Sequence, residues 1–367
     1  MKRNQLFIVG AALMLLVLVA IVVVPNVFKT TPKTTITCLG GQVFLADEGM
    51  QQRLLDEYNI EVKYVSSGSF EMKDKDLTGI DCAWPGSAPA AADFVSAHKD
   101  IVLKKDTMFR TFNLFFTRKD LGYEDAFIKA GYVYQKDGAD FMPMAPIIEA
   151  MKAHKTWEEI GVQGVPGFVN IKYSAPESSG GGLQHLFLLC SYLMPGGENG
   201  GLPCDAANLG PVLPTLVDNW NFQGGQTGSS PEWFKAWLQN SRSLPLGASS
   251  ESLFLGYYNQ LPADQKKAAL DDIVGIYSEW TIGTDHVFIA ITPNGVRLLE
   301  ILQSDPYFAQ RAWDAYGMRT AFGGLGAKPG QTDVPWIVAE PLAISEPKQD
   351  ATQMITCAIN PAKCAPK

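Results

Sequence analysis

The stretch FVNIKYSAPESSGGGLQHLFLLCSYLM, residues 168–194, joins two apolar segments through a loop of Ser, Pro and Gly. Residues 168–173 have the composition of a strand, and residues 183–194 are predicted to form an apolar helix. Glycine is unfavourable in a helix interior but lets a backbone approach another group closely, so residues 180–182 are assigned to the loop. Free N–H groups at a helix start attract anions. The loop is therefore either a flexible turn with an N-cap serine or a ligand-binding loop.

Three loops nearer the N-terminus share this composition, and each follows a predicted strand. The strands are residues 35–39, 60–65 and 79–84, and the loops are Gly40-Gly41, Ser66-Ser67-Gly68-Ser69 and Pro85-Gly86-Ser87. A helix is predicted between the first two strands, over residues 47–58. Alternating strands and helices favour a mostly parallel sheet with helices on both faces, in which ligands bind beyond the carboxyl ends of the strands. The four loops are the first functional signal.

The rest of the chain continues with helices and strands. Predicted helices cover residues 231–238, 296–303 and 306–316, with another beginning at Glu251, and predicted strands cover 273–280 and 287–292.

Charge is unevenly distributed along the 367 residues. The chain has 30 Lys plus Arg and 38 Asp plus Glu, a net charge of -8, but residues 1–30 contain three basic and no acidic residues. The other 337 residues carry 27 basic and 38 acidic residues, a net charge of -11. Nucleic-acid binding depends on basic surface, so this class of partner is excluded. A hydrophobic content of 46% excludes a disordered chain.

The basic residues Lys2 and Arg3 precede an uncharged apolar run, residues 6–24. As a helix this run would be about 28 Å long, close to the hydrocarbon thickness of a bilayer, about 30 Å. No small-x-small cleavage site follows it, which favours an uncleaved signal anchor over a cleaved signal peptide. The basic N-terminal side predicts a cytoplasmic tip and anchor over 1–28, a tether over 29–35 and an extracytoplasmic body.

Six cysteines fit an exported body, where disulfides form. Cys190 and Cys204 flank one short loop and Cys357 and Cys364 another, whereas Cys38 and Cys82 would pair if their strands are neighbours. There is no CxxC pair, and the four histidines are scattered, so a zinc site is not expected.

In this order the segments resemble the extracellular solute-binding proteins of ABC transporters, in the type 2 periplasmic-binding superfamily, and within it the sulfate/molybdate-like branch. The resemblance covers about residues 36–325. It rests on CLGG (38–41), SSGS (66–69), residues 81–87 and 174–182, SESL (250–253), TPNG (292–295) and YGMR (316–319). The inserts at 196–210 and 221–230 are longer than the family pattern.

The resemblance implies an α/β fold of two lobes, each a doubly wound sheet, joined by two crossover strands, with ligand held between the lobes and released by hinge opening. The crossings are expected near residues 112–117 and 274–280. Lobe one is then 36–114 plus 277–345, lobe two is 115–276, and 346–367 form a C-terminal tail.

An oxyanion ligand would be held by serine hydroxyls and backbone N–H groups, which bind anions locally even in an acidic protein. The candidate ligand-binding residues are Gly41, Ser67, Ser69, Ser87, Ser178, Ser179, Gly180 and Glu251. Glu251 either contacts a proton-bearing group of the ligand or caps its own helix. No cofactor and no metal are expected.

Two aromatic features have alternative interpretations. Some members of the family bind ferric iron through paired tyrosines, but the adjacent Tyr257 and Tyr258 would face different sides of a helix and are interpreted as core residues. Trp84 either lines the cleft or packs in the core.

The predicted function is capture of a small ligand, an oxyanion, by a membrane-anchored extracytoplasmic protein, for ABC-type uptake or for sensing. The partner would be an ABC permease or another membrane protein. A scaffold that keeps the fold without a ligand is the alternative. The chain lacks GxSxG, HExxH and GxxxxGK[ST] motifs, so an enzyme is not expected, and a hydrolase using Ser178 with Asp285 and His286 is the weaker alternative.

Overall fold

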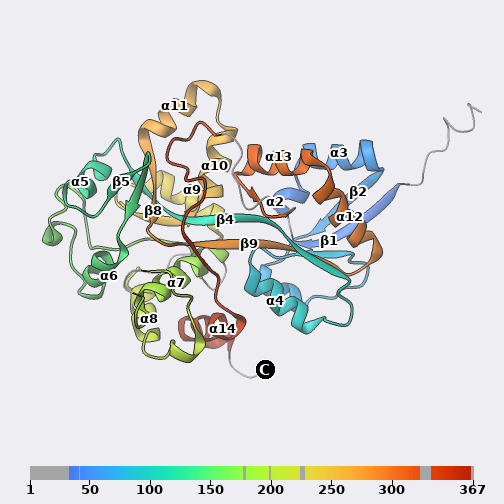
Figure 1. Ribbon diagram of the computed structural model, residues 1–367, viewed down its shortest axis with the longest axis horizontal. Coiled ribbons are helices and arrows are strands. Elements are labelled where there is room, and N and C mark those ends of the chain that lie inside the picture. The colour runs from blue at the N-terminus through green and yellow to red at the C-terminus, as the bar shows by residue number, and fades with distance from the viewer. Residues whose placement is uncertain are drawn as a thin grey trace, which may run out of the picture.

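Strand β1 (Thr34–Gly40) of the computed structural model lies between two parallel neighbours, β2 (Ile60–Val65) and β3 (Cys82–Trp84). Strand β9 (Thr281–Ala290) pairs with β3 in the antiparallel sense and extends this sheet, which forms the first lobe. The structure describes residues 33–40, 42–176, 179–197, 200–223, 228–322 and 332–364. The helices of this lobe are α2 (Gln42–Leu45), α3 (Glu48–Tyr58), η1 (Ser69–Asp74), α4 (Ala88–Ala97), α12 (Pro293–Ser304) and α13 (Pro306–Tyr316) (Figure 1).

The long strand β4 (Lys104–Arg118) connects the two lobes. It pairs with β9 along residues 104–112, and with β7 (Gly247–Ser250) and β8 (Ile273–Ser278) along residues 113–118. Strands β6 (Ala139–Met142) and β5 (Tyr134–Lys136) continue beyond β8. The second lobe adds α5 (Tyr123–Lys129), α6 (Met144–Lys152), η2 (Glu158–Ile160), α7 (Gly180–Leu193), η3 (Ala206–Asn208), α8 (Leu213–Phe222), α9 (Ser230–Asn240), α10 (Glu251–Gln260) and α11 (Ala263–Asp272).

The last part of the chain returns over both lobes. Strand β10 (Arg319–Thr320) pairs with β4, and β11 (Ala343–Ser345) pairs with β9. Helix α14 (Gln349–Ile359) and the short helix η4 (Pro361–Lys363) follow. In Figure 1 the red C-terminal segment passes across β4 and β9 to reach α14, which lies near α8 and α4.

The two-lobed α/β architecture confirms the expected fold class, but the expectation of a mostly parallel sheet was wrong. Around β4 every pairing is antiparallel, because β4 and β9 run in opposite directions through the middle of the molecule. The parallel pairs are β1 with β2 and β3, β6 with β8, and the short strand β11 with β9. The residue boundaries expected for the lobes, tether and tail stay predictions.

The strand predicted over residues 168–173 was also wrong. Only isolated bridges form there, from Phe168 to Thr156 and from Lys172 to Gly247. The N–H of Tyr173 donates to the side chain of Gln223 at 3.0 Å and not to a neighbouring strand. The segment is therefore extended, but its backbone pairing is limited to single bridges: around Gly247 of β7, Lys172 donates to the carbonyl of Leu246 at 2.9 Å and accepts the N–H of Ala248 at 2.7 Å, and no continuous ladder forms.

All three expected disulfides are present. Cys38 and Cys82 are register partners on the parallel strands β1 and β3, which confirms that their strands are neighbours. The other pairs, Cys190–Cys204 and Cys357–Cys364, close short loops as expected.

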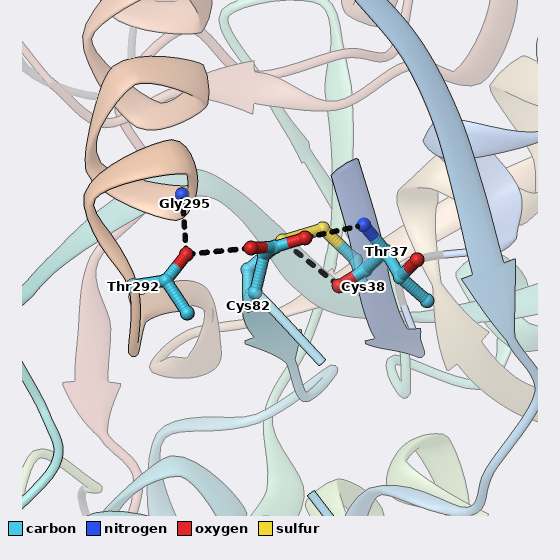
Figure 2. Close-up of a disulfide and its surroundings, with 6 residues drawn as sticks. Thr37, Cys38, Cys82, Thr292 and Gly295 are labelled. Atoms are coloured by element: carbon cyan, nitrogen blue, oxygen red, sulfur yellow. Dashed lines mark hydrogen bonds between the residues drawn. A yellow bond between two sulfur atoms is a disulfide. The ribbon is translucent and has the colours of Figure 1, made fainter. Parts of the chain in front are cut away.

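A half-buried polar network lies beside the Cys38–Cys82 disulfide and joins it to helix α12 (Figure 2). One oxygen of Asp81 accepts the N–H of Thr37 at 2.9 Å, and the other accepts the hydroxyl of Thr292 at 2.6 Å. Thr292 is the N-cap of α12, and its Oγ1 also accepts the N–H of Gly295. The network fixes the start of α12 against β1 and β3.

Replacing Thr292 with alanine removes both the cap and the contact with Asp81, so we expect the free energy of unfolding to fall by about 1–2 kcal/mol. Thr292→Ser keeps the hydroxyl and should lose less than half of that amount. Chemical unfolding followed by tryptophan fluorescence measures the difference. Equal losses in the two variants would contradict the capping role.

In the part of the chain that the structure describes, no helix combines the length and apolar character needed to cross a bilayer. The anchor predicted over residues 6–24 lies outside the described residues.

Candidate functional site

In lobe two, serine hydroxyls gather where helices α7 and α9 begin. Ser174 and Ser179 are 2.7 Å apart between their hydroxyl oxygens, and Ser179 also bonds to Ser230, the first residue of α9. The N–H of Gly181, in the first turn of α7, donates to Ser230 Oγ at 3.2 Å. The hydroxyl of Ser249 on β7 is fully buried beside Gly181, and it has no hydrogen-bond partner among the described residues. We call these five residues the serine cluster.

In lobe one, the start of helix α4 has a similar character. Ser87, its N-cap, is 3% exposed, and its hydroxyl makes no hydrogen bond to any residue that the structure describes. The N–H of Ala88 donates to a carboxylate oxygen of Glu346 at 2.9 Å. On the adjacent loop, Ser69 Oγ accepts the N–H of Gly86 at 3.0 Å. The N-terminus of α4 is therefore in contact with a carboxyl group supplied by the C-terminal segment.

A pocket lies between residues close to these two helix starts, although the serine cluster, Ser87 and Glu346 are not among its lining residues. Pro89 in the first turn of α4 and Pro176, four residues before α7, both line it, which places the two lobes on opposite walls. Helix α14 supplies a third wall through a row of polar residues, Gln349, Thr352, Gln353 and Thr356. The geometry is that of an interlobe cleft covered by the C-terminal helix.

Charged groups beside Ser87 and Glu346 lie on β4 and β9. Arg110 binds Asp285 with two hydrogen bonds, of 2.5 and 2.9 Å. Burial lowers the pKa of His286 to about 4, so this ring, which lies next to Gly86, is neutral at pH 7. Burial, together with the charge of Asp285, raises the pKa of Glu346 to about 8.

The structure brings four of the predicted residues to these two helix starts. Ser69 and Ser87 belong to the lobe-one wall, while Ser179 and Gly180 belong to the start of α7. Ser67 lies on the same loop as Ser69, but its hydroxyl donates to the carbonyl of Gly68. Gly41 and Ser178 lie outside the described residues.

The glycine triplet at residues 180–182 does not form a loop, contrary to the expectation. It is the first turn of α7, which begins three residues earlier than predicted. A Cβ at Gly182 would lie 2.0 Å from the carbonyl oxygen of Ser174, so the triplet lets the helix start against the serine loop.

Glu251 lies in a buried ion pair. Its carboxylate, 0% exposed, accepts two hydrogen bonds from Arg319 at 2.6 and 2.7 Å and one from the Tyr277 hydroxyl at 2.9 Å. Although burial opposes its charge, contact with Glu251 raises the pKa of Arg319. Both oxygens of Glu251 are thus engaged within the protein, and the structure offers a role in fixing the start of α10.

The aromatic residues for which the sequence left two interpretations open lie in the core; they are Tyr257, Tyr258 and Trp84. Tyr258 is 1% exposed, stacks on Phe254 and donates its hydroxyl to Asp333 at 2.7 Å, while Tyr257 packs against the same cluster. Trp84 is 3% exposed and packs against both Phe44 and Phe109, which also stack on each other. Within the described residues, no group of three or more His, Cys, Asp or Glu side chains is arranged to hold a metal ion.

Sequence reasoning missed three residues of the site. Ser230 and Ser249 come from a long insert and from a short connection whose composition is unremarkable. Glu346 belongs to the C-terminal tail, which no motif linked to the cleft. Only the serine-rich composition around residues 229–230 gave a signal that could have found one of them.

No protein-family model matches the chain, and no curated protein matches its sequence. Solved structures match over most of its length. Iron-bound HitA from Pseudomonas aeruginosa is 10% identical with a TM-score of 0.57, and the match covers 89% of this chain and 99% of that one. IdiA (FutA) from Trichodesmium, in complex with iron and citrate, is 9% identical with a TM-score of 0.56, over 90% and 98% of the two chains.

The periplasmic binding protein AfuA from Actinobacillus pleuropneumoniae, with fructose-6-phosphate bound, is 12% identical with a TM-score of 0.55, over 90% and 98% of the two chains. These similarities do not single out the sulfate/molybdate-like branch, which stays a prediction. They agree with the lobes, the crossing strand and the interlobe pocket in showing that this chain has the two-lobed α/β fold of periplasmic binding proteins.

Proposed function

We propose that the chain is a membrane-tethered, extracytoplasmic solute-binding protein that captures a small oxyanion between its lobes. The captured ligand would be passed to an ABC-type permease or reported to another membrane partner. The serine cluster is the observation that carries the proposal, because it combines two helix starts with a buried hydroxyl, Ser249, that has no described partner.

Neutral donors suit a small anion in an acidic protein. Buried polar groups are nearly always hydrogen-bonded, so an unpartnered hydroxyl beside a helix start favours a missing acceptor there. The macrodipoles of α7 and α9 add partial positive charge at the same place. Such a site attracts an oxyanion locally, although the body carries a net charge of -11.

The structural neighbours broaden the choice of ligand. The ligands bound in these structures are iron, iron with citrate, and fructose-6-phosphate, so this fold holds both metal and phosphate-bearing solutes. In this chain the adjacent tyrosines pack in the core, which disfavours iron held by that pair. The hydroxyl-rich wall instead favours sulfate, phosphate or a phosphorylated solute. No step of this function requires catalysis, so we propose a binding protein and not an enzyme.

A thermal-shift screen followed by calorimetry tests the proposal. Sulfate, phosphate, molybdate and fructose-6-phosphate form the oxyanion set, with ferric citrate and a neutral amino acid as comparisons. A true ligand at a hundredfold excess over its Kd stabilises the protein by about 2.7 kcal/mol. No shift with any solute would favour the ligand-free scaffold.

Ser249→Ala locates the site. Its hydroxyl makes no described hydrogen bond, so we expect the unliganded stability to change by less than about 0.5 kcal/mol. Oxyanion affinity should fall about tenfold, the equivalent of one hydrogen bond to a charged group. Ser96→Ala, on the exposed side of α4, is the matched control and should bind like the wild type. Equal affinity in the two variants would place the ligand elsewhere.

A further inference from the structure

The C-terminal segment touches both walls of the cleft. Strand β11 adds to β9, Glu346 follows, and helix α14 packs against α4 of lobe one and α8 of lobe two. Ala351 and Ile355 on α14 are buried in the lobe-two core, whereas Thr352 and Thr356 line the pocket beside α4. Figure 1 shows this segment crossing the connecting strands before it reaches the two lobes at α14. Hinge opening would have to detach α14 from one lobe or carry it along.

Glu346 occupies the place where a helix attracts an anion. Its Oε2 accepts the N–H of Ala88 in the first turn of the ten-residue helix α4, and its Oε1 accepts the Thr284 hydroxyl at 3.4 Å. The hydroxyl of Ser87 at the same helix start is 3% exposed and has no described partner. The carboxyl oxygens of Glu346 and the oxygens of an oxyanion ligand can both accept hydrogen bonds from these donors. The N-terminus of α4 therefore has two candidate occupants, an oxyanion ligand and the chain's own Glu346.

We propose that residues 343–364 form an intramolecular strap whose Glu346 carboxyl holds the anion position of α4, so that the strap and an oxyanion ligand compete for it. The inference rests on the proposed function for its ligand, but not for the docking of the strap. A ligand that displaces Glu346 weakens the hold of α14 between the lobes. Ligand entry, strap release and lobe opening are then coupled through one contact.

The charges around Glu346 make this contact sensitive to pH. Asp285 on β9 acts on Glu346 through its charge, Arg110 on β4 is paired with Asp285 and also interacts with Glu346, and α4 donates the N–H of Ala88. Burial raises the pKa of docked Glu346 to about 8, whereas in a released strap the pKa returns to its ordinary value of 4.5. The docked strap thus binds more protons between these two values, and docking weakens as the pH rises from about 4.5 through about 8.

The first experiment compares Glu346→Ala with Glu340→Ala, which replaces an exposed glutamate just before the strap. Hydrogen exchange of residues 349–359 is measured on the intact, oxidised full chain, and sulfate and phosphate affinities are measured by calorimetry. Glu346→Ala should speed exchange of α14 at least tenfold and tighten binding of the oxyanion at least tenfold. Glu340→Ala should match the wild type in both measurements.

The second experiment uses Glu346→Gln, which is uncharged at every pH and keeps an acceptor for Ala88. Wild type and variant are compared at the same pH, which cancels the intrinsic pH dependence of exchange. Between pH 5 and 8, exchange of α14 in the wild type should accelerate relative to Glu346→Gln, by up to about tenfold per pH unit for a single proton. A constant ratio across this range would overturn the role assigned to Glu346.

The outcomes separate the two proposals. Unchanged exchange of α14 and unchanged oxyanion affinity in Glu346→Ala would overturn the strap while the proposed function stands. Failure of sulfate, phosphate and the phosphorylated solute to bind any variant, including one with a released strap, would overturn the proposed function.

Discussion

Replacing Arg319 with methionine is expected to lower the free energy of unfolding by about 3–5 kcal/mol, because it leaves a buried carboxylate without its counter-ion. Arg319 and Glu251 are both 0% exposed and share two hydrogen bonds. The guanidinium also donates to the carbonyls of Val338 and Ala339, at 2.8 and 2.6 Å, and lies 4.8 Å over the ring of Phe112. In the variant only the Tyr277 hydroxyl still faces Glu251.

The size of this effect depends on burial, and the control tests that dependence. Arg297 is exposed on α12 and donates to the carbonyl of Tyr58, so Arg297→Met should change stability by less than about 0.5 kcal/mol. The double variant Arg319→Met/Glu251→Leu removes both charges and should recover much of the loss, since apolar replacements of buried pairs are often well tolerated. Midpoints of chemical unfolding are measured for these variants and for the single variant Glu251→Leu. A loss in the double variant equal to the sum of the two single losses would contradict a coupled pair.

The sequence predicted those strands and helices whose ends are marked by turn-forming or capping residues. The predicted strand at residues 60–65 matches β2, since it alternates and then meets a Ser/Gly loop. The predicted helix at 306–316 matches α13, which has the N-cap Asp305, a proline at its first position and Gly317 in the left-handed region at its end. Such features act within a few residues, so they can be read without knowing the fold.

Features that depend on contacts distant in sequence could not be predicted. Residues 168–173 look like a strand, but their partners are a side chain and a bridge to β7. Glu251 was a candidate ligand residue because nothing in the sequence reveals its partner, Arg319, 68 residues away. Glu346 reaches Ala88 across 258 residues, and a tail residue carries no local sign of that contact. Of the predicted serine and glycine loops, only that of residues 174–182 contributes to the wall of the described pocket, through Pro176, whereas much of that wall comes from the C-terminal segment.

The glycine triplet provides the second large effect, because its members should respond oppositely to one methyl group. A Cβ at Gly182 would lie 2.0 Å from the Ser174 carbonyl oxygen and 3.0 Å from the nitrogen of Pro176, both backbone atoms. Relief requires α7 and the serine loop to move apart, so Gly182→Ala should lower the free energy of unfolding by about 3 kcal/mol. At Gly180 a Cβ would have no described atom within 4 Å, and Gly180→Ala should raise stability by about 0.5–1 kcal/mol through helix propensity.

Oxyanion binding should also differ between the Gly182→Ala and Gly180→Ala variants. The hydroxyls of Ser174 and Ser179 are 2.7 Å apart, and moving α7 away from the serine loop would separate them. We therefore expect Gly182→Ala to weaken oxyanion binding at least tenfold in the protein that remains folded. Unfolding midpoints and sulfate calorimetry on the same preparations distinguish a local from a global effect. Equal stability of Gly180→Ala and Gly182→Ala would mean that the loop yields easily. In that case the triplet would be a flexible turn and not the close contact that brings two helix starts together around the serine cluster.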